Sequence, residues 1–202
     1  MNIRPNSLIQ DFSSSEPMVD FLSRGPLGPD TWLFVYDAWM VRPLIDAPVR
    51  HPALVRGWRR SVLTALKTGG KELPLTLISN GSTHGALILL TNPQIEFVWD
   101  YWLHDKLYRP VWVNASSFGK KVRAMTFVTP RRIVDRSAIG YLLRDDPEIS
   151  TVKAAAIVAH DINAALREMD VSDLYLIRLE RELRAAANNT GHHNQARLRS
   201  EV

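Results

Sequence analysis

Apolar residues follow two different periods along this chain. Over the first two thirds they form short runs of strand length, at 32–36, 75–79, 85–90, 111–115 and 122–128. From residue 150 onward they recur every three to four positions, which predicts a helix ending near Met169 and a second helix capped by Ser172. Strands followed by a pair of helices are typical of an α+β domain.

Turn-forming residues divide these runs into elements. Asn80-Gly81 predicts a tight hairpin between two short strands. Asn92-Pro93 predicts the start of a helix that reaches about Tyr108. The segment 116–120 predicts a second hairpin, and Gly57-Trp58 is expected to open the strand that follows the loop after Tyr36.

The distribution of turn-forming and polar residues also predicts one domain with two extensions. Residues 1–30 are rich in proline, serine and glycine, so we expect an irregular N-terminal extension with at most one short helix near Met18. The compact domain is expected over 31–184. Residues 185–202 are polar and lack an apolar period, which predicts a C-terminal tail.

Composition narrows the classes of function. The 202 residues include 46% hydrophobic residues, enough for one sizeable core. The net charge is +4 and the basic residues are dispersed, so we expect no nucleic-acid partner. The chain has no cysteine, its histidines lack metal-ligand spacing, and no apolar run approaches the ~18 residues of a membrane span. With no secretory signal pattern at its start, we expect a cytoplasmic protein without a metal.

Several motifs occur together in a fixed order. They are the Tyr36-Asp37-Ala38-Trp39-Met40 loop, Arg42-Pro43, Gly57-Trp58-x-Arg60, Trp99, Tyr108-x-Pro110-x-Trp112 and Met169-x-Val171-x-Asp173. Their order and spacing resemble those of the ChaC-like γ-glutamylcyclotransferases. The resemblance covers roughly residues 31–183.

This resemblance implies a small mixed β-barrel with flanking helices and a lyase that needs no cofactor. The family reaction cleaves glutathione to 5-oxoproline and cysteinylglycine, so the implied ligand is a small γ-glutamyl compound such as glutathione. The loop from Tyr36 to Met40 stands where the family binds that compound, and Tyr36, Asp37, Ala38, Trp39 and Met40 are therefore the candidate substrate-binding residues.

The catalytic position is altered in this chain. Cyclisation requires the substrate's α-amine to lose a proton and the leaving amine to gain one, a task for one carboxylate. The resemblance places the family's catalytic Glu at Trp102. On a helix, Asp105 lies about 60° from that position and Asp100 about 160°. Asp105 is thus one candidate catalytic residue, and Asp37 in the loop is the other.

Simpler roles compete with these assignments. Trp102 is at a helical spacing from Trp99 and fits a core aromatic, and Asp37 fits a turn residue that accepts a hydrogen bond from its own backbone. Two functions therefore stay open. One is a γ-glutamylcyclotransferase with impaired activity, and the other is a silent relative, a pseudoenzyme that binds a γ-glutamyl ligand or a protein partner. The sequence gives no indication of the oligomeric state.

Overall fold

The computed structural model describes residues 17–26, 30–47, 50–62, 75–104, 108–129 and 149–200. Their elements are α1 (Met18–Ser23), β1 (Thr31–Val35), the 3₁₀ helix η1 (Ala38–Met40), β2 (Arg50–Val62), β3 (Leu75–Leu90), α2 (Asn92–Leu103), β4 (Arg109–Ser117), β5 (Lys120–Val128), α4 (Ile149–Glu168) and α5 (Leu174–Ser200).

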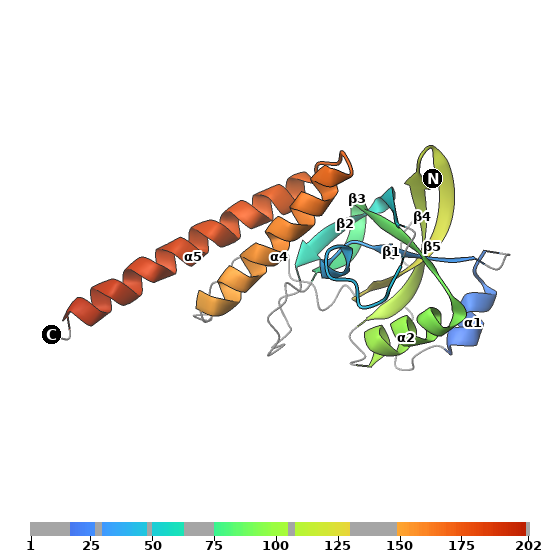
Figure 1. The fold of residues 1–202 in the computed structure, drawn as a ribbon, viewed down its shortest axis with the longest axis horizontal. Coiled ribbons are helices and arrows are strands. Elements are labelled where there is room, and N and C mark those ends of the chain that lie inside the picture. The colour runs from blue at the N-terminus through green and yellow to red at the C-terminus, as the bar shows by residue number, and fades with distance from the viewer. Residues whose placement is uncertain are drawn as a thin grey trace, which may run out of the picture.

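The five strands form a closed barrel in the order β1-β3-β2-β4-β5 (Figure 1). β1 pairs antiparallel with β3 and closes the barrel through a parallel pairing with β5, where Leu33 stands opposite Met125. Both of these side chains are buried, as are Val55 and Leu87 on the neighbouring strands. The predicted single α+β domain with a small mixed barrel and flanking helices is confirmed.

The predicted Asn80-Gly81 hairpin is wrong, because β3 runs through this dipeptide without reversing. Asn80 and Gly81 have φ values of 72° and 159° and together stand opposite Gly57 of β2, itself at φ 85°. The pairing passes from Arg56–Ser82 to Trp58–Ser79, so these positive φ angles serve a β-bulge. Gly57 therefore lies inside a strand that begins at Arg50 and does not open it.

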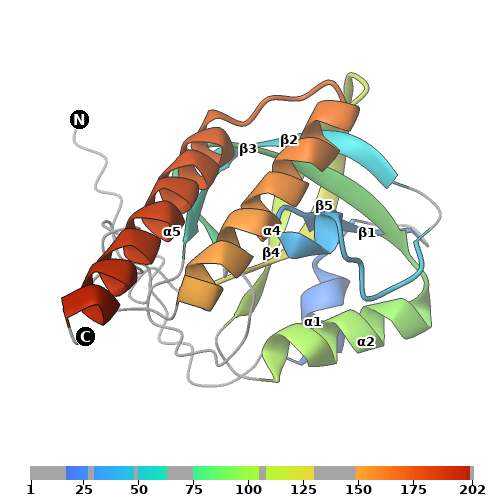
Figure 2. The ribbon, with the colours of Figure 1, turned by 60° about the vertical axis from the view of Figure 1, so that its left-hand side comes forward.

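α1 and α2 cover the barrel near one end (Figure 2). The backbone N–H of Thr91 donates to Gln94 Oε1 at 2.8 Å, so the cap of α2 lies one residue before the predicted Asn92. α1 lies within the segment expected to be an extension, yet Phe21 is buried in the core. Its ring stacks on Trp112, with centroids 4.9 Å apart.

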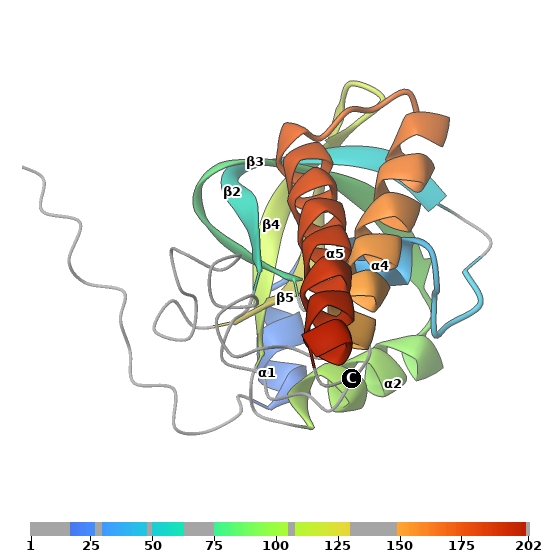
Figure 3. The same ribbon diagram turned by 90° about the vertical axis from the view of Figure 1, so that its left-hand side faces the viewer.

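α4 and α5 form a helical pair that extends away from the barrel (Figures 1 and 3). The predicted apolar faces are confirmed, since the buried positions include Val152, Ala155, Ala156, Ala159, Ile162, Leu166, Leu176, Leu179 and Leu183. The cap of α5 is Asp173 and not Ser172, because Asp173 Oδ1 accepts from the N–H groups of Tyr175 and Leu176. α5 continues to Ser200, well into the segment expected to be a polar tail.

A polar cluster joins the two helices around Glu180. Its carboxylate contacts His160 Nδ1 at 2.9 Å, accepts from Asn163 Nδ2 at 2.8 Å and pairs with Arg184 at 2.8 Å. Burial raises the pKa of Glu180, but the hydrogen bonds from Asn163 and His160, together with the charge of Arg184, outweigh this and lower the pKa overall. The ionised form is therefore the one that holds α4 to α5.

We expect Glu180→Gln to destabilise the fold at neutral pH by about 1.5–3 kcal/mol, the usual contribution of hydrogen bonds to a charged group. Because folding lowers this pKa, the stabilisation is complete above the unfolded value of 4.5 and is lost as the pH falls through the lower folded value. Urea unfolding at pH 7 and at acidic pH should show the difference between variant and wild type narrowing below pH 4.5. A constant difference would contradict this role.

Candidate functional site

The candidate site is built on the turn that follows β1. Tyr36 is buried, and its hydroxyl donates to the backbone oxygen of Phe127 at 2.7 Å while Thr76 hydrogen-bonds to the same phenol. Burial raises the pKa of Tyr36 well above its ordinary value, and the charge of Asp37 adds to this. The phenol thus stays protonated and tied across the barrel end, which suits an orienting residue.

Asp37 acts as a turn residue. It is buried, and its Oδ1 accepts from the N–H of Trp39 at 3.0 Å, capping η1. The next N–H groups are also used inside the turn, since Met40 donates to the oxygen of Asp37 and Val41 to that of Ala38, each at 3.0 Å. These donors stabilise the turn itself, and are not directed toward a bound carboxylate.

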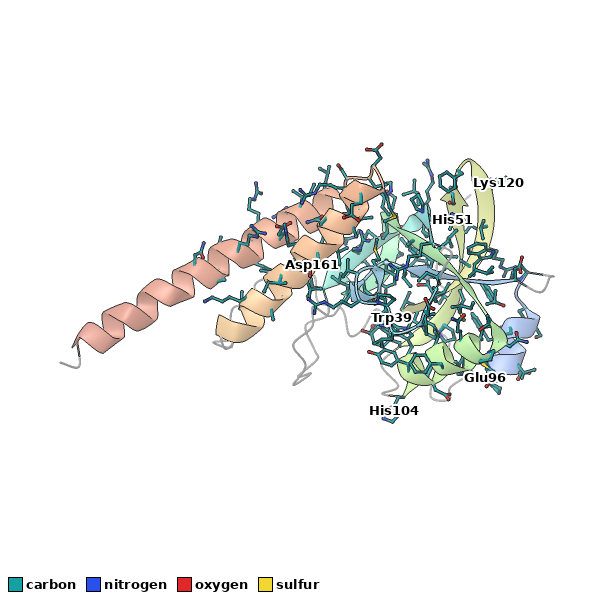
Figure 4. All side chains as sticks on the ribbon, viewed as in Figure 1. Trp39, His51, Glu96, His104, Lys120 and Asp161 are labelled. Atoms are coloured by element: carbon teal, nitrogen blue, oxygen red, sulfur yellow. The ribbon has the colours of Figure 1, made fainter. Side chains whose placement is uncertain are left out.

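The side chains of Ala38, Trp39 and Met40 are buried as well. Figure 4 shows Trp39 between the barrel and α2, whereas Glu96 and His104 lie on the outer side of that helix. All five candidate binding residues, Tyr36 to Met40, therefore belong to one compact turn whose side chains pack inward.

Trp102 lies against this turn from the last part of α2. Its ring stacks on Phe127, with centroids 5.8 Å apart and planes at 12°, and meets Trp39 at 5.5 Å. Tyr108 packs edge-on against it at 4.6 Å. Trp102 is only partly buried, so it is an aromatic at the edge of the core and not a fully enclosed core residue.

A small cavity lies among Trp102, the first residues of the turn, and strands β1 and β5. It is lined by Leu33, Phe34, Val35, Tyr36, Asp37, Trp102, Thr126 and Phe127, and its volume is about 10 Å³. A space of that size holds about one water molecule. The structure thus places Trp102 beside Tyr36 and Asp37, across a space that has room for little more than a water molecule.

The candidate catalytic residue Asp105 lies outside the described residues, and two other acidic residues, Asp100 and Glu96, are exposed on α2. Within the described ranges, no three His, Cys, Asp or Glu side chains gather in a way that could hold a metal ion. In those same ranges, no helix combines the length and apolar character of a membrane span.

Sequence reasoning missed the role of Arg60, which is completely buried behind the turn. Its Nε donates to the backbone oxygen of Tyr36 at 2.7 Å, and its terminal nitrogens donate to Asp173 and to the backbone oxygen of His84. Burial lowers the pKa of Arg60, while the charges of Asp173 and Asp37 oppose the shift. The signal available was the combination of Gly57-Trp58-x-Arg60 with Met169-x-Val171-x-Asp173.

Comparison with known proteins gives matches in structure alone. Neither the models of known families nor the curated proteins include one that matches the sequence. A selenomethionine-labelled γ-glutamyl cyclotransferase specific to glutathione, from yeast, matches at a TM-score of 0.59 and 12% identity, over 79% of this chain and 97% of that one.

Two further structures match at TM-scores of 0.54 and 10% identity. A γ-glutamyl cyclotransferase matches over 75% of this chain and 86% of its own. An uncharacterized protein from Homo sapiens matches over 76% of this chain and 88% of its own. At such identities the likeness defines a fold and no more, and that fold is the one predicted from the motifs. The chain has the fold of the γ-glutamyl cyclotransferases.

Proposed function

We propose that this protein is a ChaC-like γ-glutamylcyclotransferase relative that binds a small γ-glutamyl compound, such as glutathione, beside Tyr36, but turns it over poorly. The fold and the position of the turn support the ligand class. The observation that supports impaired turnover most is the packing of Trp102 on Phe127 and Trp39, at the place where the resemblance puts the catalytic Glu.

The chemistry of the cavity agrees with this proposal. Cyclisation needs a carboxylate that moves a proton from the attacking amine to the leaving amine. Among the described residues that line the cavity, Asp37 supplies the one carboxylate, and its Oδ1 already accepts from Trp39. A γ-glutamyl ligand can enter only when the ring of Trp102 moves aside, because the space present is about 10 Å³. Weak binding and slow turnover follow from the same side chain.

Calorimetric titration with glutathione and with cysteinylglycine tests the ligand class, because the second compound lacks the γ-glutamyl group. Glutathione should bind measurably and more tightly. Equal heats from both compounds, or no heat from either, would remove the support for a γ-glutamyl ligand. Release of 5-oxoproline from the same samples reports turnover separately, so binding without turnover and turnover at ordinary rates are distinguishable.

A further inference from the structure

The part of β2 that follows the bulge is buried on both faces. Before the bulge the buried residues Ala53 and Val55 alternate with more exposed ones, whereas Arg60, Ser61 and Val62 are buried in succession after it. One of these three side chains is a cation, which is costly to bury unless it is paired.

The buried guanidinium of Arg60 contacts the candidate turn at two points. Besides its bond to the oxygen of Tyr36, one terminal nitrogen lies 3.7 Å from Met40 Sδ. The guanidinium therefore contacts both ends of the turn that holds Asp37. Because the peptide unit is planar, fixing the oxygen of Tyr36 also fixes the direction of the Asp37 N–H. The side chain of Arg60 thus fixes the backbone direction with which the chain enters η1.

The same guanidinium connects the turn to the helical pair. Asp173, which pairs with Arg60, also caps α5 through the N–H groups of Tyr175 and Leu176, at 3.0 and 3.2 Å. A second link lies nearby, where Arg42, just after η1, pairs with Asp161 of α4 at 3.2 Å. The start of α5 and the candidate turn consequently share one buried ion pair.

We propose that Arg60 is the positioning residue of this site, holding the Tyr36–Met40 turn in the shape that receives the ligand. The identity of the ligand in this inference rests on the proposed function, whereas the claim that Arg60 holds the turn in shape does not. A lysine has the same charge, yet its single ammonium group lacks the planar fork that reaches the oxygen of Tyr36, the oxygen of His84 and Asp173 together. The positioning role therefore requires the planar geometry of the guanidinium as well as its positive charge.

The test compares Arg60→Lys with Arg59→Lys, a matched control at the adjacent exposed arginine of the same strand. Far-ultraviolet circular dichroism and thermal unfolding establish that each variant is folded at the temperature of measurement. Folded Arg60→Lys should lose about tenfold or more in glutathione affinity, as misplaced binding groups do. It should also change the near-ultraviolet signal of the Trp39–Trp102 pair. Arg59→Lys should leave both readouts at the wild-type level.

The outcomes separate this inference from the proposed function. Folded Arg60→Lys with wild-type affinity and a wild-type near-ultraviolet signal would overturn the positioning role. If wild type itself binds no glutathione, the proposed ligand is wrong, and the near-ultraviolet comparison alone decides the role of Arg60. If Arg60→Lys does not fold, Asp173→Asn replaces it, because asparagine still caps a helix. That variant should change the same signal, and an unchanged signal would overturn the proposal.

Discussion

The purified protein is expected to release 5-oxoproline from glutathione about 10²–10⁴-fold more slowly than a relative with Glu at the position of Trp102, the usual contribution of one placed acid–base group. The reason is that, among the described residues, α2 brings no carboxylate to the cavity, and the ring of Trp102 packs on Phe127 there. A discontinuous assay for 5-oxoproline at saturating glutathione measures the difference. Ordinary rates would show that another group serves, and Asp105→Asn and Asp37→Asn should then be compared to identify it.

Repair of this site should need more than one substitution. Trp102→Glu alone should restore little, because the new carboxylate would stand beside Asp37, and two such charges ~4 Å apart repel by roughly 4 kcal/mol at intermediate dielectric. It would also remove a ring that contacts Phe127, Trp39 and Tyr108, at a cost of up to about 3–5 kcal/mol for a buried aromatic.

Adding Asp37→Gly and Ala38→Ser should improve ligand binding over Trp102→Glu alone. The change at Asp37 removes the repulsive charge, and glycine replaces an N-cap residue at a cost of only a few tenths of a kcal/mol. Calorimetric titration of the single and triple variants with glutathione measures the effect. Equal affinities would mean that the turn after Tyr36 is not where the ligand binds.

Arg60→Met is expected to destabilise the protein by about 3–5 kcal/mol, because it leaves Asp173 as an uncompensated buried charge. Asp173 is 9% exposed, and the pair that it forms with Arg60 is sealed from solvent on the arginine side. Adding Asp173→Asn should recover much of the loss, since the second substitution removes that charge and keeps a side chain that can cap α5. Arg59→Met, on the exposed side of the same strand, should stay within about 0.5 kcal/mol of wild type.

Urea unfolding of the wild type, both single variants and the double variant gives the coupling free energy of the pair. A coupling near zero would show that Arg60 is held by its backbone acceptors, Tyr36 and His84, and not by Asp173. One measurement thus distinguishes the contribution of the backbone acceptors from that of the Asp173 carboxylate.

The sequence predicted the elements whose patterns are local. β1, the β4–β5 hairpin and α4 were foreseeable because each follows a simple period of apolar positions bounded by turn residues. Asn80-Gly81 was misread for the opposite reason. The dipeptide favours positive φ angles in a bulge as well as in a hairpin, and only the length of the pairing between β2 and β3 distinguishes the two.

The candidate site was predicted in part for similar reasons. The bond from Asp37 to Trp39 spans two residues, so turn chemistry was enough to suggest it. The burial of Arg60 depends on Asp173, which is 113 residues away in sequence. No local pattern contains that information. Prediction therefore ended at the motif in which Arg60 occurs.

The bulge has a consequence for how this chain can change in length. Removing the single residue Gly57 would shift every later side chain of β2 to the opposite face, which turns Arg60 away from Asp173. A library of single-residue deletions should therefore be depleted between Gly57 and Val62, even at the exposed positions Gly57 and Arg59.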